Sequence, residues 1–185
     1  MTDDIRKYIR LVENTLMELQ RPAQEEAAII LTNAGYEKIG SGYYADVYHR
    51  VGDRWVLKLV ATRDHAYKKF VDFCGRYESP HLPIFRGKFM RVTSDYAAIR
   101  MEKLSPLPPG PKIEKDIYYM ALNLRYYNGE YSMLPDNARI WGANHPELRD
   151  VLQALGRELG ECCDDICKQN VMFRDDTYVL IDPVG

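Results

Sequence analysis

The sequence has few of the features that mark secreted, membrane-spanning or nucleic-acid-binding proteins. Only four of its 185 residues are cysteine, and three of them crowd together as Cys162, Cys163 and Cys167 instead of spacing out like a disulfide framework. No apolar run approaches the roughly 20 residues that a membrane-spanning helix needs, and the N-terminus lacks the apolar core of a signal peptide. The net charge of -2 provides no basic field for nucleic acid. We therefore expect a cytoplasmic protein with reduced thiols, no membrane association and no direct nucleic-acid binding.

The chain does have enough apolar residues to bury a core. Hydrophobic residues make up 46% of the sequence, which predicts one compact unit or two small lobes. Apolar residues at helical spacing predict an amphipathic helix over residues 3–20 and a second helix from Pro22 to Gly35. From Tyr36 the residues become β-prone and favour a hairpin around the turn Val51-Gly52-Asp53.

A proline-rich connector over residues 105–111 divides the rest of the chain. The remaining predicted elements are a helix over 64–77 capped by Asp64, strands near 84–92 and 96–102, and helices near 113–127 and 146–162. We therefore predict an α+β fold with two lobes. It consists of N-terminal helices over 1–35, a mostly antiparallel β lobe over 36–104 and a reduced helical lobe over 105–185.

Two glycines and a lysine in the β lobe suggest phosphate binding. Gly40 and Gly42 allow the backbone to turn tightly and approach phosphate oxygens, although a G-x-G pair also marks ordinary strand bulges. Lys58 lies within the apolar strand Val56–Val60, where a buried ammonium needs an anion to neutralise it. Together the two features favour an anionic ligand more than either does alone.

A second polar motif lies in the last residues of the chain. Asp165 is followed by four residues and then Asn170, and two short apolar runs around a polar turn predict a hairpin that ends at Asp182. This arrangement places two carboxylates and one amide on one side of a small sheet. Asp and Asn are common in surface loops because their side chains stabilise turns, so this spacing alone does not indicate a functional site and needs support from another motif.

The order of these motifs resembles the protein-kinase fold. Gly40, Gly42 and Val47 match the kinase glycine loop, with Ala45 in place of its third glycine, and Lys58 matches the strand lysine. Residues 101–104 occupy the hinge position, where kinases contact adenine through backbone groups. The residues that this resemblance assigns to ATP binding are Gly40, Ser41, Gly42, Tyr43, Ala45, Val47, Lys58, Met101, Glu102 and Leu104.

The same resemblance assigns roles at the C-terminus. It implies that Asp165 is the catalytic aspartate and that Lys58 and Lys168 are also catalytic. It also implies that Asn170 and Asp182 hold Mg²⁺ or Mn²⁺ together with ATP. The His-Arg pair that precedes the catalytic acid in most kinases is replaced by Cys163-Asp164. The chain stops at Gly185, so we expect no activation loop of the usual kind within it.

Residues 30–185 resemble, more narrowly, the early host-takeover serine/threonine protein kinases of short-tailed bacteriophages. The stretches that carry this resemblance are GSGYYADVYHR, FVDFCGRYESPHLP and NVMF followed by LIDPV. It implies an enzyme of the host bacterial cytoplasm that phosphorylates host proteins and itself on serine and threonine. Whether it forms a homodimer stays open.

Two alternatives remain at this stage. One is a phosphotransferase for small molecules, of the aminoglycoside or choline kinase type, which also needs no activation loop. The other is a kinase-shaped binding protein without activity, which the loss of the His-Arg pair favours. The four residues Lys58, Asp165, Asn170 and Asp182 favour an active enzyme.

Overall fold

The computed structural model describes residues 22–42, 45–126, 133–160 and 165–184. The chain divides into two compact units. We call them the sheet unit, which is Met1–Arg63 with Gly87–Arg100, and the helical unit, which is Asp64–Arg86 with Met101–Gly185. The division falls just before the predicted boundary at residue 104. It also differs from the prediction in placing residues 64–86 with the helices.

The sheet unit is built on five strands in the order β1-β2-β3-β5-β4. The strands are β1 Glu37–Ser41, β2 Ala45–His49, β3 Trp55–Ala61, β4 Phe85–Arg91 and β5 Tyr96–Glu102, and the ends of β4 and β5 run into the helical unit. Strand β2 pairs antiparallel with both β1 and β3, and a β-bulge between Lys38 and Gly40 interrupts the first pairing. The predicted hairpin and the two later strands are therefore confirmed.

One face of this sheet is covered by the helix over residues 22–33. Its Ala27 and Leu31 pack in a buried cluster with Tyr36 and with side chains from β2, β3 and β5. The residues contributed by these strands are Tyr48, Leu57, Leu59, Ala61, Tyr96 and Ala98. The helix matches the prediction and is followed by Gly35, whose positive φ of 83° ends it in the manner of a glycine C-cap. The predicted helix over 3–20 lies outside the described residues.

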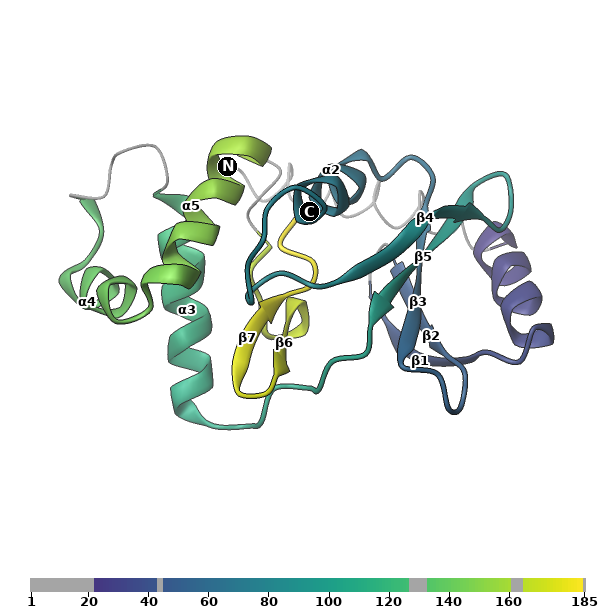
Figure 1. Cartoon of the computed structure of the whole chain (residues 1–185), viewed down its shortest axis with the longest axis horizontal. Helices are drawn as coiled ribbons and strands as arrows, with labels where there is room; N and C mark the ends of the chain where they lie inside the picture. Colours follow the sequence, from purple (N-terminus) through teal and green to yellow (C-terminus); the bar gives the residue numbers. More distant parts are fainter. Residues whose placement is uncertain (1–21, 43–44, 127–132, 161–164, 185) are drawn as a thin grey trace, which may run out of the picture. The chain divides into compact units, whose positions relative to one another are not determined.

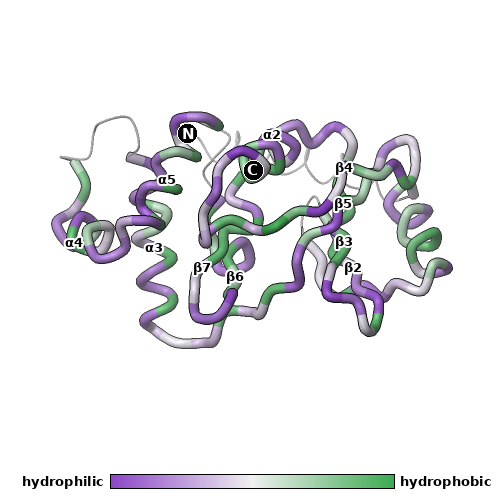
Figure 2. The backbone as a smooth tube through the Cα atoms, viewed as in Figure 1, coloured by the Kyte–Doolittle hydropathy of each residue, from purple (hydrophilic) through white to green (hydrophobic). Residues whose placement is uncertain are grey.

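The helical unit contains four α-helices among its described residues. They are α2 His65–Cys74, α3 Pro111–Arg125, α4 Asp136–Asn144 and α5 Pro146–Leu159 (Figure 1). Helix α3 packs against α4 and α5, and α5 also contacts α2. Figure 2 shows hydrophilic and hydrophobic residues alternating along α3 and α5, as expected for helices with one buried face.

Helix α2 begins as predicted but ends early. The Asp64 Oδ1 atom accepts a hydrogen bond from the Tyr67 amide at 2.9 Å, which confirms the N-terminal cap. The helix ends at Cys74, with Gly75 as its C-cap, instead of continuing to residue 77. Arg76, just beyond the end, forms an ion pair with Glu158 of α5. The placement of α2 with the helices follows from its contacts with α5.

Helix α4 was not predicted from the sequence. Its buried residues are Ala138, Trp141 and Gly142, which form a short apolar stripe in a segment with poor helix formers. Tertiary contacts stabilise it, because the Trp141 Nε1 atom donates to the buried Asp116 carboxylate of α3 at 2.8 Å. Asn123 of α3 adds a side-chain bond to the Ala138 carbonyl at 3.2 Å.

The predicted C-terminal hairpin is present as β6 Val171–Arg174 and β7 Thr177–Leu180, shown in yellow in Figure 1. Its turn residues Asp175 and Asp176 have positive φ angles of 46° and 65°, which aspartate tolerates better than most residues. The Tyr178 hydroxyl of β7 donates to Asp116 at 2.6 Å. Burial and this bond raise the pKa of Tyr178 above its usual range, so it stays a neutral donor that ties the hairpin to α3.

Within the described ranges, no helix is long and apolar enough to cross a membrane.

Candidate functional site

The Asp165-x4-Asn170 motif forms a closed turn in the helical unit. The short 3-10 helix Lys168–Asn170 turns the chain back, and the backbone N–H of Asn170 donates to the Cys167 carbonyl at 3.0 Å. The Asn170 Nδ2 atom donates to the Asp165 carboxylate at 2.7 Å and to the Asp165 carbonyl at 3.0 Å. The four-residue spacing thus brings the acid and the amide into direct contact.

The chain on either side of Asp182 is bonded to this turn. The Ile181 amide donates to the Asn170 carbonyl at 2.9 Å, and the Asp165 amide donates to the Pro183 carbonyl at 3.4 Å. Asp165 is exposed, whereas Asn170 and Asp182 are half-buried. Hairpin β6–β7 begins directly after Asn170 and ends just before Asp182, so it brings the chain at Asp182 back to Asn170. The structure therefore brings Asp165 and Asn170 into direct contact and bonds both neighbours of Asp182 to them. We call these three residues and the chain that joins them the acid loop.

The orientation of the Asn170 amide suits a metal ligand. Because Nδ2 donates to Asp165, the Oδ1 atom is the one that can accept a cation. Asp182 is half-buried, and a carboxylate is an oxygen ligand of the kind that Mg²⁺ prefers. No group of three or more His, Cys, Asp or Glu residues in the described part of the chain is placed to hold a metal ion. The donor set thus fits a metal that arrives with further oxygen ligands.

Neutral groups surround the acid loop. Burial raises the pKa of Tyr67 on α2 well above its usual value, and the negative charge of Asp182 raises it further. Burial, followed by the charge of Asp165, likewise raises the pKa of the Cys167 thiol. Both groups therefore stay protonated at neutral pH, so Cys167 is present as a neutral thiol and not as a thiolate nucleophile. Lys168, the other predicted catalytic residue, is exposed on the 3-10 helix between Asp165 and Asn170.

In the sheet unit, three predicted nucleotide-binding residues lie in line across neighbouring strands. Gly40 of β1 pairs with Val47 of β2, and Val47 pairs with Lys58 of β3. Paired residues carry their side chains on the same face of a sheet. Lys58 alternates with Leu57 and Leu59, which pack towards the helix over 22–33, so its side chain lies on the opposite face. Lys58 is only 4% exposed, as its apolar strand predicted.

Gly42, directly after β1, lies close to Ala45 at the start of β2. Its amide donates to the Ala45 carbonyl at 2.7 Å. A Cβ atom at Gly42 would lie only 3.3 Å from that carbonyl oxygen, closer than nearly all real side chains approach. Glycine is therefore favoured here by close backbone approach and not by a positive φ. Ala45 is buried and Ser41 exposed, and Tyr43 lies outside the described residues.

The predicted hinge residues are partly committed to the fold. Met101 is buried, and the Glu102 amide donates to the Ile84 carbonyl at 2.9 Å. The Glu102 carboxylate accepts from the Ile84 amide at 2.7 Å and from Arg174 Nε at 3.0 Å, with a second bond from Arg174 Nη2. Neither the amide nor the carboxylate of Glu102 is left for a nucleotide. Leu104, the third hinge residue, is half-buried.

Arg174 is a residue that the sequence motifs did not single out. Besides Glu102, its guanidinium donates to the carbonyls of Pro80 at 2.9 Å and Leu82 at 3.0 Å. Next to Arg174, Phe173 of β6 forms a β-bridge with Ser105 through two backbone hydrogen bonds of 2.8 and 2.9 Å. These contacts anchor hairpin β6–β7, and with it the acid loop. The only sequence signal was a charged residue at a hairpin turn, which is common.

We expect Arg174→Met to destabilise the protein by about 2 kcal/mol or more. The change removes a paired fork of hydrogen bonds and leaves the Glu102 carboxylate, whose side chain is 16% exposed, without its cation. Urea unfolding followed by circular dichroism measures the loss. Arg139→Met is the matched control, because its ion pair with Asp136 is exposed and should contribute no more than about 0.5 kcal/mol. Equal losses in the two variants would contradict the anchoring role of Arg174.

His81 provides a second anchor for the hairpin. Its Nδ1 atom donates to the Tyr178 carbonyl at 2.8 Å, and the Leu180 amide of β7 donates to the His81 carbonyl at 3.0 Å. Burial lowers the pKa of His81, and the charges of His145 and Arg174 act in the same direction. The Tyr178 carbonyl and the Glu147 charge oppose this shift without reversing it.

The lowered pKa of His81 predicts a specific loss of stability in acid. The unfolded chain binds a proton at His81 near its ordinary pKa of about 6.5, whereas the folded chain binds it only at lower pH. The stability that neutral His81 contributes is therefore present above that value and lost as the pH falls below it. Between pH 7.5 and 5.0, the free energy of unfolding should fall more for wild type than for His81→Asn, which keeps a donor but does not titrate. Parallel decreases in urea unfolding would contradict this prediction.

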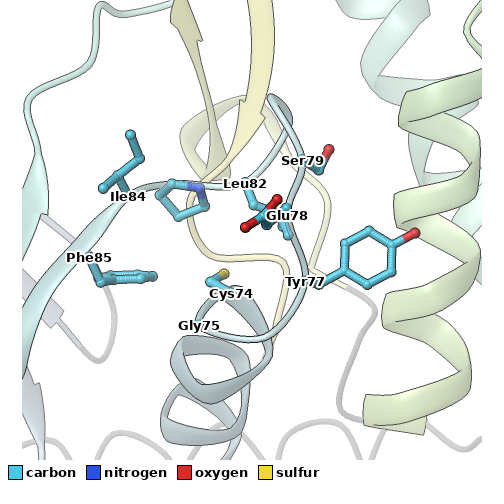
Figure 3. Close-up of a pocket in the computed structure, with 9 residues that line it drawn as sticks. Cys74, Gly75, Tyr77, Glu78, Ser79, Leu82, Ile84 and Phe85 are labelled. Atoms are coloured by element: carbon cyan, nitrogen blue, oxygen red, sulfur yellow. The ribbon is translucent and has the colours of Figure 1, made fainter.

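A pocket of about 290 Å³ lies at the C-terminal end of α2. Its lining is Cys74, Gly75, Tyr77, Glu78, Ser79, Leu82, Pro83, Ile84 and Phe85 (Figure 3). Burial raises the pKa of Cys74 above its usual range, so the pocket contains a neutral thiol. None of the predicted site residues lines it, and the sequence motifs did not indicate it.

Comparison with known proteins does not establish a family. No protein-family model matches the chain, and no curated protein sequence matches it. Among solved structures, the chain is similar to the crystal structure of Rad53 1-466 in complex with AMP-PNP, with a TM-score of 0.43 and 15% sequence identity. The match covers 80% of this chain and 38% of the Rad53 chain. The chain thus spans less than half the length of that protein.

Proposed function

We propose that the protein is an ATP-dependent phosphotransferase of the protein-kinase type. The observation that carries this proposal is the acid loop, where Asn170 bonds directly to Asp165 and the chain around Asp182 is bonded to both. Kinases use an acid, an amide separated from it by four residues, and a later acid for one reaction. The abundance of Asp and Asn in loops would not explain why the backbone on both sides of Asp182 is bonded to these two residues.

The sheet unit would bind the phosphates of ATP. The Gly42 amide is bonded to the Ala45 carbonyl, so phosphate oxygens would be contacted by other backbone amides of residues 40–45, and Lys58 would contact the α- and β-phosphates. Val47 shares the face of the sheet with Lys58 and would contact the base. Because the amide of Glu102 is used within the fold, contacts of the hinge with adenine would come from other backbone groups of residues 101–104.

The helical unit would hold the metal and the acceptor. Asn170 Oδ1 and the Asp182 carboxylate would bind Mg²⁺ or Mn²⁺, which neutralises charge on the transferring phosphoryl group. The exposed Asp165 would orient the acceptor hydroxyl and accept its proton. The bond from Asn170 Nδ2 keeps the Asp165 carboxylate in a fixed orientation. The exposed Lys168 ammonium lies on the same loop and would contact the γ-phosphate.

More narrowly, we propose a serine/threonine protein kinase that acts on proteins of a host bacterium and on itself. This finer proposal is supported by the resemblance of residues 30–185 to the host-takeover kinases of short-tailed bacteriophages. Its substrates would be host proteins, and a homodimer would be compatible with phosphorylation of one copy by another.

The experiment is to incubate the protein with γ-labelled ATP and Mg²⁺ in a bacterial lysate. Asp165→Asn is the inactive control, because Asp165 is exposed and its replacement should leave the fold intact. Label on many proteins and on the enzyme itself, at serine and threonine, supports the proposal. Label only on small molecules would indicate a small-molecule phosphotransferase. Label no greater than that of the control would indicate a binding protein without activity.

A further inference from the structure

The carboxylate of Asp46 is buried beside the glycine turn. Asp46 is 1% exposed, although it lies on β2 only four residues after Gly42. Its Oδ1 atom accepts from the Ser41 hydroxyl at 2.6 Å, and its Oδ2 atom accepts from the side-chain Nε2 of Gln24 at 3.0 Å. The Lys38 ammonium lies 3.4 Å from both oxygens. Three donors therefore compensate for the burial of one charge.

These donors join the two ends of the turn to the helix behind it. Ser41 and Asp46 are direct partners in the pairing of β1 with β2, and they flank the turn at Gly42. Gln24 belongs to the first turn of the helix over 22–33. The Asp46 side chain thus connects the last residue of β1, the first part of β2 and that helix.

The Asp46 carboxylate lies on the side of the sheet away from Lys58. Asp46 pairs with Leu59, which packs in the cluster beneath the helix over 22–33, whereas Val47 pairs with Lys58. Successive residues of a strand point to opposite faces. Asp46 therefore cannot contact a ligand bound on the Lys58 face. The Lys38 ammonium, 49% exposed in its side chain, neutralises the charge that a polyphosphate would otherwise meet nearby.

We propose that Asp46 is a positioning residue that holds the backbone at Ser41 and Gly42 in place for phosphate binding, from the face of the sheet opposite Lys58. The proposal rests on the proposed ATP-binding function of the sheet unit. The bond from Ser41 orders the backbone that leads into Gly42, so less ordering of Ser41 and Gly42 is needed when ATP binds. The bond from Gln24 makes the helix over 22–33 part of this support. Asp46 acts on ATP affinity and has no part in the transfer step.

Asp46→Asn tests the proposal with little change in shape. Its Oδ1 atom can still accept from Ser41, but its Nδ2 atom then faces the donors of Gln24 and Lys38. We expect the KM for ATP to rise about tenfold, the factor for one lost hydrogen bond to a charged group, with kcat within about twofold. Amide hydrogen exchange at Gly40 and Gly42 without ATP should become faster. Gln24→Ala should raise the KM less, about threefold.

Glu25→Ala is the control, because Glu25 is an exposed neighbour of Gln24 on the same helix and should leave KM, kcat and exchange unchanged. If Asp46 had a purely structural role, Asp46→Asn would have a lower melting temperature, a smaller active fraction and therefore a lower kcat, with an unchanged KM for ATP. That result would overturn the proposal. Unchanged KM and exchange in a folded Asp46→Asn protein would also overturn it. If wild type binds no ATP, the proposed function fails by that measurement alone. The exchange rates then still decide whether Asp46 orders the turn.

Discussion

Asp165→Asn is expected to lower kcat for phosphoryl transfer about a thousandfold while leaving ATP binding nearly unchanged. The amide cannot accept the proton of the acceptor hydroxyl, and general-base catalysis typically contributes between about 10² and 10⁴ in rate. The fold should survive, because Asp165 is exposed and an amide can still accept the Asn170 hydrogen bond. The measurement is kcat with a labelled protein acceptor, together with ATP affinity by calorimetry.

Asp176→Asn is the matched control for this substitution. Asp176 is an exposed residue of the β6–β7 turn with a positive φ of 65°, which asparagine tolerates equally well. Its kcat should equal that of wild type. Near-normal turnover of Asp165→Asn would remove Asp165 from catalysis. A larger loss in Asp164→Asn, at a position outside the described residues, would show that the neighbouring acid performs this role.

Asp182→Asn is expected to weaken binding of the ATP–Mg²⁺ complex and slow transfer by at least about a hundredfold. It removes a full negative charge from the half-buried position at which we propose that the metal and the polyphosphate bind, which corresponds to a few kcal/mol of electrostatic stabilisation. Calorimetry of ATP binding with and without Mg²⁺ should show that the stimulation by the metal is lost. Asn170→Ala should reduce this stimulation less, because a neutral amide ligand can be replaced by water.

The outcome for Asp182 bears on the whole acid loop. Equal ATP affinity in wild type and Asp182→Asn under both conditions, with normal turnover, would remove Asp182 from the metal site. Loss of affinity that does not depend on Mg²⁺ would instead indicate a disturbed fold, since Asp182 also lies near the buried Tyr67 of α2. Thermal unfolding of the variant distinguishes these cases. Asp176→Asn again provides a control for the substitution itself.

Features that depend on near neighbours in the chain could be read from the sequence. The Asp64 cap, the hairpins and the apolar face of α5 depend on residues a few positions apart, and the structure contains all of them. The Asp165-x4-Asn170 spacing belongs to the same class, because a turn of six residues closes by local bonds. Helix α4 escaped prediction because its stability comes from the distant Asp116 and not from its own residues.

Contacts between distant residues were decided only by the tertiary structure. Arg174 and Glu102 are 72 residues apart, and His81 and Tyr178 are 97 apart, so no local pattern could pair them. The same holds for Gln24 and Asp46 across 22 residues. The sequence determined which side chains can bind phosphate, metal and proton. The tertiary structure decided which of their atoms are already used, such as the Glu102 carboxylate and Asn170 Nδ2, because hydrogen-bond partners are set by folding.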